Sequence, residues 1–135
     1  MNWRPERLLL DVALEAVADQ VMVVSLRGEL DLDTAAQLRS AVDGLLARDA
    51  TRIVVDLAGL SFCDSVGLST FTVAGAACAG AGGYLRLAAP TPFLLRLLGV
   101  VGVLHRLSVY DSVEAACQAD STHLVVPPDP GPKRS

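Results

Sequence analysis

The chain is poor in aromatic residues and in positive charge. Phe, Tyr and Trp make up only 4% of its 135 residues, whereas hydrophobic residues make up 52%. Its core must therefore be built mainly from the aliphatic side chains of Leu, Val and Ala. Lys133 is the only lysine, the formal net charge is −4 and the isoelectric point is near 5.0. Because nucleic-acid binding needs clustered Lys and Arg to neutralise phosphates, this composition argues against a nucleic-acid-binding protein.

Cysteine is also sparse. The three cysteines, Cys63, Cys78 and Cys117, lie far apart and form no C-x-x-C pair. An odd count without that spacing is typical neither of a disulfide framework nor of a zinc site. No other group of His, Cys and carboxylate residues has the spacing of metal ligands. We therefore expect buried free thiols in a reducing cytoplasm, and no metal.

Apolar runs long enough to cross a membrane are missing as well. Asp11 and Glu15 interrupt the apolar patch near the N-terminus, which makes it a poor signal peptide. The longest other apolar stretch, residues 93–107, contains Arg96 and His105. It falls short of the roughly 20 apolar residues that a transmembrane helix requires. We expect a soluble, cytoplasmic protein with no membrane segment.

Hydrophobic periodicity predicts strands that alternate with helices. The expected strands are residues 8–17, 21–28, 51–57, 84–89 and 107–110, with a short loop between the third strand and Cys63. The expected helices are residues 34–49, 65–83, 91–99 and a last one that begins at Asp111. After a first hairpin, this order favours parallel strands in an α/β domain. We assign residues 8–119 to that domain and residues 120–135 to a Pro-rich disordered tail.

Capping residues predict where the helices begin and end. The expected signals are, in chain order, a capping box at Thr34 and Gln37, a stop at Gly82-Gly83, an N-cap at Thr91 before Pro92, a stop at Gly99, and a capping box at Asp111 and Glu114. The helix that follows Asp64 is rich in Ala and Gly. Its small residues would let it lie close to the sheet.

The motif "CDSVG" places Asp64 and Ser65 where a strand gives way to a helix. It nearly matches the G-x-S-x-G turn of serine hydrolases, but Cys63 replaces the glycine that permits the strained turn. A catalytic triad also needs a histidine base, and only His105 and His123 exist. These departures argue against a nucleophile. A helix N-cap explains both residues, and capping is compatible with a further function.

The motif "ELDLDTA" raises the possibility of a phosphatase. Asp31 and Asp33 form a D-x-D pair after an apolar strand, but Ala35 stands where the haloacid-dehalogenase pattern needs Thr. Such enzymes also use a lysine, and Lys133 lies in the tail. Phosphate-binding glycine motifs of nucleotide sites are absent too. We therefore expect no enzymatic activity and no cofactor.

Four segments together resemble a STAS domain, in particular the free-standing anti-sigma-factor antagonists. They are "RGELDLDTAAQL", "IVVDLAGLSFCDSVGLSTF", "LRLAAPTPFLLRLLGVVGV" and "LSVYDSVEAA". The resemblance spans about residues 12–118. It implies an α/β fold with a mixed sheet of about five strands flanked by four helices. Two departures are Val66, where many members have a second Ser or Thr, and Val103, where Leu is usual.

The resemblance also implies a function and a site. Antagonists of this kind bind a serine-kinase anti-sigma factor and free the sigma factor. The kinase phosphorylates the serine after the aspartate, here Ser65, and a metal-dependent serine/threonine phosphatase reverses this. With the neighbouring helix surface included, the expected partner-binding residues are Asp31, Asp33, Thr34, Asp64, Ser65, Val66, Gly67 and Ser69. An alternative is a STAS scaffold or sensor module that recruits another regulator or binds a small ligand without phosphorylation. We expect a monomer or a weak dimer.

Overall fold

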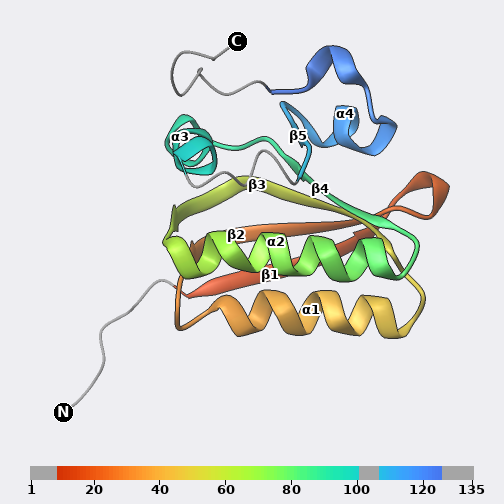
Figure 1. Ribbon diagram of the computed structural model, residues 1–135, viewed down its shortest axis with the longest axis horizontal. Helices are drawn as coiled ribbons and strands as arrows, with labels where there is room; N and C mark the ends of the chain where they lie inside the picture. Colours follow the sequence, from red (N-terminus) through yellow and green to blue (C-terminus); the bar gives the residue numbers. More distant parts are fainter. Residues whose placement is uncertain (1–8, 101–106, 126–135) are drawn as a thin grey trace, which may run out of the picture.

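A computed structural model shows a five-stranded sheet in the order β1-β2-β3-β4-β5 (Figure 1). The structure describes residues 9–100 and 107–125. Leu8, Val103, His105 and the tail residues 126–135 therefore lie outside the described residues. The strands are β1 Leu10–Ala16, β2 Met22–Leu30, β3 Arg52–Cys63, β4 Tyr84–Ala88 and β5 Val109–Tyr110.

The sheet is mixed, as predicted. β1 and β2 form an antiparallel hairpin around the short 3-10 turn Ala18–Gln20, in which Asp19 and Gln20 have positive φ. β2 to β5 then pair in parallel. The helices that separate these strands are α1 Ala35–Ala47, α2 Ser65–Gly80 and α3 Pro92–Val100, and α4 Val113–Gln118 follows β5. Five strands and these four helices confirm the predicted fold class.

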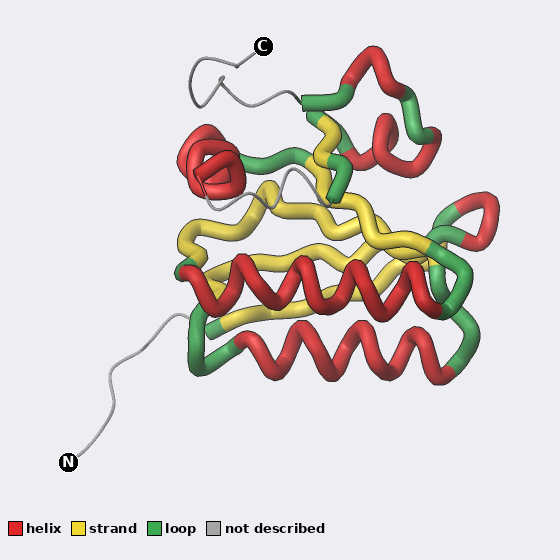
Figure 2. The backbone as a smooth tube through the Cα atoms, in the orientation of Figure 1, coloured by secondary structure: helices red, strands yellow, loops and turns green. Residues whose placement is uncertain are grey.

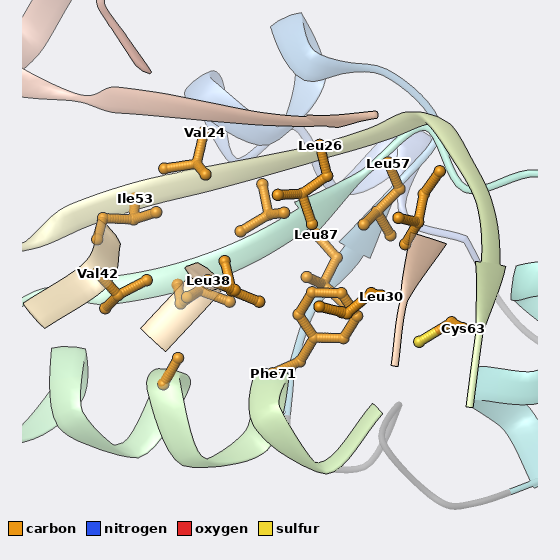
Figure 3. Close-up of a cluster of buried hydrophobic side chains, with 14 of the residues drawn as sticks. Val24, Leu26, Leu30, Leu38, Val42, Ile53, Leu57, Cys63, Phe71 and Leu87 are labelled. Carbon is orange, nitrogen blue, oxygen red and sulfur yellow. The ribbon is translucent and has the colours of Figure 1, made fainter. Parts of the chain in front are cut away.

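Two helices, α1 and α2, lie side by side over one face of the sheet (Figures 1 and 2). The main core fills the space between them and the sheet, and Figure 3 shows its centre. Phe71 of α2 is fully buried there, against a surround of Leu, Val and Ile. The core is therefore aliphatic, as the composition predicts, with one aromatic ring on α2. Alternation along the strands places Val23 and Val54 on the opposite face, with Ala115 of α4.

β3 is longer than predicted. The apolar run of residues 51–57 predicts a strand that ends at Leu57, but the strand runs without interruption to Cys63. Its pairing with β2 continues to Leu30 opposite Cys63, and two register shifts absorb the extra residues of β3. Such bulges bend a strand without ending it. The turn-like residues after Leu57 were misinterpreted because a bulge and a loop look alike in sequence.

Some capping predictions are confirmed and others are wrong. Gly82 has φ +88° after α2, and the Thr91 hydroxyl accepts the Leu94 N–H at 3.2 Å. Gly99 lies inside α3 and does not end it at that position. Ser112, rather than Asp111, caps α4 by accepting the Ala115 N–H at 3.1 Å.

The capping box at Thr34 and Gln37 is also wrong. The Thr34 side chain makes no bond to the first turn of α1. Its hydroxyl donates instead to the Glu29 carbonyl at 2.8 Å and accepts the Asp31 N–H at 2.9 Å. Thr34 therefore closes the turn that precedes α1.

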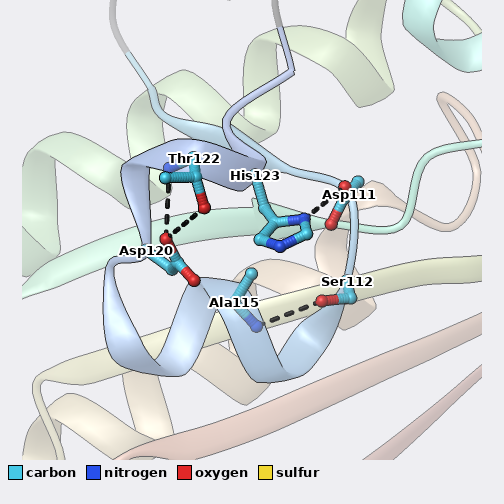
Figure 4. A network of polar contacts seen from close by, with 6 residues as sticks. All are labelled: Asp111, Ser112, Ala115, Asp120, Thr122 and His123. Carbon is cyan, nitrogen blue, oxygen red and sulfur yellow. Dashed lines mark hydrogen bonds and ion pairs between the residues drawn. The ribbon is translucent and has the colours of Figure 1, made fainter.

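The first residues of the expected tail are ordered. Ser121–His123 form a 3-10 turn, and Leu124 makes an antiparallel bridge with Tyr110. The His123 carbonyl accepts the Asp111 N–H. His123 Nδ1 also donates to Asp111 Oδ2 at 2.8 Å (Figure 4). This hydrogen bond and the carboxylate charge raise the pKa of His123. The folded domain therefore extends past residue 119, to at least Val125.

We predict that Gly67→Ala destabilises the domain, because α2 lies very close to the end of β2. A Cβ at Gly67 would lie 2.6 Å from the Leu30 carbonyl oxygen and 2.9 Å from Cys63 Sγ. We expect the free energy of unfolding in urea to fall by about 1–3 kcal/mol. Gly80→Ala is the control on the same helix, since nothing lies within 4 Å of its added Cβ. An equal loss in both variants would contradict this account of the packing.

We predict that Asp111→Asn lowers the pKa of His123, as measured by NMR titration of the imidazole. A raised histidine pKa means that the folded state binds the proton more tightly than the unfolded state. The hydrogen bond between His123 and Asp111 therefore stabilises the folded state at low pH, and this stabilisation is lost as pH rises through the raised pKa of His123. Asp120→Asn serves as a comparison, because Asp120 acts on His123 only through its charge and less strongly. If the pKa of His123 were the same in Asp111→Asn as in the unchanged protein, the proposed effect of this bond would be wrong.

Candidate functional site at the ends of β2 and β3

The predicted site residues gather where β2 and β3 end. Because these strands are parallel and paired as far as Leu30 and Cys63, both chains leave the sheet at the same edge. β2 leads through the turn Asp31–Thr34 into α1, and β3 leads through Asp64 into α2. In Figure 1 both helices begin at the left end of the molecule. In parallel sheets, this carboxyl edge is where binding sites form.

Asp64 joins the two junctions. It is the N-cap of α2, and its Oδ1 accepts the Gly67 N–H at 2.8 Å. Its Oδ2 accepts the Leu32 N–H of the neighbouring turn at 3.1 Å. The Asp64 N–H in turn donates to the Leu30 carbonyl. One residue therefore caps a helix and bonds the turn that starts the other helix, which confirms the predicted N-cap.

Asp31 organises the other junction. Its Oδ1 accepts the N–H groups of Asp33 and Thr34 at 3.0 and 3.1 Å. The Thr34 side chain, which is only 4% exposed, bonds the Asp31 N–H and the Glu29 carbonyl. Asp31, Asp33 and Asp64 thus lie at the same edge of the sheet.

Ser65 is the first residue of α2 and is exposed. Its hydroxyl sits at a helix N-terminus, where free N–H groups and the helix dipole favour a negative group. His123 bonds Asp111 rather than Ser65, and His105 lies outside the described residues. The part of the chain that the structure describes also contains no group of three or more His, Cys, Asp or Glu that could hold a metal ion. This arrangement leaves the Ser65 side chain exposed at the first turn of α2.

The cysteines show no reactive environment. Burial, followed by the charges of Asp64 and Asp31, raises the pKa of the Cys63 thiol to about 12. Burial raises the pKa of Cys78 to about 11 and also raises that of Cys117. All three are free thiols, and Cys117 is only half-buried. Because a thiolate is the nucleophilic form, these residues stay unreactive near neutral pH.

The predicted partner-binding residues fall into two groups. Ser65, Val66, Ser69 and Asp33 are exposed, and Asp31 and Asp64 are half-buried at the same edge. Thr34 and Gly67 are buried, and their assignment as contact residues stays a prediction. Thr34 closes a turn, and Gly67 permits the close approach of α2 to β2. No helix among residues 9–100 and 107–125 has the length and apolarity to cross a membrane.

Sequence reasoning missed Leu32. It is the most exposed of the large apolar side chains in the described residues, at 70%. It lies between Asp31 and Asp33 and bonds through its N–H to Asp64. An apolar residue between two acids directly after a strand is the signal that could have revealed it. Val66 and Val73 add exposed apolar surface on α2, with exposed fractions of 38% and 47%.

Comparison with known proteins agrees with this geometry. The family model described as "Mlab, STAS domain" matches residues 13–124. The anti-sigma-F factor antagonist RsfB of Mycobacterium tuberculosis is 46% identical over 54 residues. That match covers 38% of this chain and 44% of RsfB, so the similarity extends over less than half of the curated relative.

Solved structures share the fold. An anti-sigma factor antagonist from Mycobacterium paratuberculosis superposes with a TM-score of 0.73 and 27% identity, over 82% of this chain and 92% of that one. The Bacillus cell fate determinant SpoIIAA in its phosphorylated form superposes with a TM-score of 0.62 and 24% identity, over 81% and 99%. With a family model matched over most of its length and a sheet of the same architecture, this chain belongs to the STAS domain family.

Proposed function

We propose that this protein is an anti-sigma-factor antagonist controlled by phosphorylation of Ser65. In its unmodified form it binds a serine-kinase anti-sigma factor, so that the sigma factor is released. The observation that carries the proposal is the exposed Ser65 hydroxyl at the start of α2, on an edge with exposed apolar and acidic side chains. The similarity to RsfB and to the antagonist from M. paratuberculosis supports it. The protein would act in the cytoplasm, where its partners are expected.

The switching reaction is a phosphoryl transfer from ATP. The Ser65 oxygen loses its proton and bonds to the γ-phosphorus, the bond to the β-phosphate oxygen breaks, and ADP leaves. The kinase supplies the catalytic groups, and this chain supplies the acceptor. A metal-dependent serine/threonine phosphatase would return Ser65 to the hydroxyl by hydrolysis. The fold tolerates the modification in SpoIIAA, which has been solved in a phosphorylated form.

The local charges explain how the phosphate would act. At neutral pH it adds about −1.5 to −2 charges and three acceptor oxygens. The helix N-terminus accommodates an anion, so the domain stays folded. The edge already carries the carboxylates of Asp31, Asp33 and Asp64. A phosphate there must be desolvated against any docked partner and repels acidic groups on it, so binding weakens.

The family model that matches this chain favours a second candidate. It names another STAS group, "Mlab", rather than the antagonists. In that candidate function the same edge recruits a different regulator, or the domain binds a small ligand, and Ser65 remains unmodified. Recovery of the bound partner from cells separates the two functions, because only the antagonist retains a serine-kinase anti-sigma factor.

We predict that the kinase partner adds one phosphoryl group to Ser65. After incubation with the kinase and ATP, intact-mass analysis is expected to show a single addition, and Ser65→Ala is expected to show none. Ser69→Ala is the control, since Ser69 is another exposed serine of α2. Phosphorylation of Ser65→Ala would show that the site assignment is wrong.

We predict that Ser65→Asp weakens binding of the kinase partner by at least about tenfold, roughly 1.4 kcal/mol. The negative charge adds to the acidic edge, while the helix start keeps a side chain that it accepts. The Asn side chain of Ser65→Asn has nearly the same size as Asp but carries no charge. We expect this variant to bind the kinase partner more tightly than Ser65→Asp does. Calorimetry measures the affinity, and circular dichroism checks that both variants fold. Equal affinities for Asp and Asn would contradict an electrostatic switch.

A further inference from the structure

We propose that Asp64 is a positioning residue that couples the state of Ser65 to the turn that carries Leu32. While Ser65 is unmodified, the Asp64 carboxylate holds the Leu32 backbone at the end of β2. When Ser65 carries a phosphate, that bond is lost and the turn is released. The inference rests on the proposed function only in taking Ser65 as the phosphorylated residue.

The carboxylate divides its two oxygens between two elements. Oδ1 accepts the Gly67 N–H of α2 at 2.8 Å, and Oδ2 accepts the Leu32 N–H at 3.1 Å, across 32 positions of sequence. The other amides of the turn, those of Asp31, Asp33 and Thr34, bond to side chains within the turn itself. The Leu32 amide is therefore the amide of this turn that is tied to α2.

The bond positions an exposed apolar side chain. Leu32 projects with 70% of its surface exposed, and Val66 lies two residues beyond Asp64 with 38% exposed. Asp64 thus stands between two apolar groups that come from different elements. A backbone bond at Leu32 fixes where its side chain sits relative to Val66, and so fixes the surface that a partner meets.

A phosphate on Ser65 competes with both bonds of Asp64. Ser65 follows Asp64 directly, so the added charge lies beside the carboxylate and repels it. The phosphate oxygens also accept N–H groups at the first turn of α2, where Gly67 now donates to Asp64. The Leu32 bond is solvent-exposed, so water can replace Asp64 as the acceptor. The turn that carries Leu32 can therefore lose its bond to Asp64 while the domain stays folded.

The variant Asp64→Asn tests the bond to Leu32 separately from the bond that caps α2. Asn is a good N-cap, and its single carbonyl oxygen can still accept the Gly67 N–H. The amide nitrogen that replaces the second oxygen cannot accept from Leu32. We expect the exchange rate of the Leu32 amide with water, measured by NMR, to rise about fivefold, the effect of losing one ordinary hydrogen bond. Asp64→Ala, which lacks both oxygens, is expected to raise the exchange rates of both Leu32 and Gly67.

The decisive sample carries phosphoserine at position 65, incorporated during translation so that no kinase is needed. We expect its Leu32 amide to exchange faster than in the unmodified protein. The increase in rate is expected to equal the increase in Asp64→Asn. We also expect phosphoserine to add no further change at Leu32 in the Asp64→Asn background. The coupling would be overturned if phosphoserine left the Leu32 amide exchange rate unchanged. It would also be overturned if phosphoserine raised that rate as much in the Asp64→Asn protein as in the protein with Asp64.

The proposed function fails by a different result. If the kinase partner does not modify Ser65, the antagonist switch is wrong, but the amide exchange of the phosphoserine protein still reports on Asp64. If the kinase modifies Ser65 and the Leu32 amide is unaffected, the switch stands and the coupling through Asp64 is wrong.

Discussion

The parallel pairing of β2 and β3 is the constraint on which the site depends. It continues through two register shifts to Leu30 and Cys63, so both chains leave the sheet side by side. The Asp31–Thr34 turn and the start of α2 then become neighbours, although about thirty residues separate them in sequence. Asp64 joins them with one carboxylate.

The packing of α2 follows from the same edge. Gly67 lets the helix begin in contact with the Leu30 carbonyl, a space that even one methyl group would overfill. Further along α2, Phe71 fills the centre of a core that is otherwise aliphatic (Figure 3). Ser65, the first residue of the same helix, remains exposed. Thr34 and Gly67 are both buried at this edge, where Thr34 closes the turn before α1 and Gly67 permits the close approach of α2 to β2.

Much of the fold was predictable because its signals are local. Apolar runs of the strands, helical spacing and the glycine after α2 depend on neighbouring residues, and these predictions are confirmed. Two of the capping errors arise because a side chain bonds a partner outside its own helix. Thr34 bonds the Glu29 carbonyl instead of capping α1, and Asp111 bonds His123 while Ser112 takes the cap. Several residues can cap a helix, and tertiary contacts select among them.

The sequence by itself determined the element order, the aliphatic core and the Asp64-Ser65 pair at a helix start. Each of these follows from composition or from short-range spacing. Only the tertiary structure decided that β3 continues to Cys63, that Asp64 reaches Leu32, and that Leu32 is exposed while Thr34 is buried. These features depend on which strands pair and in which register, and register is a contact between segments far apart in the chain.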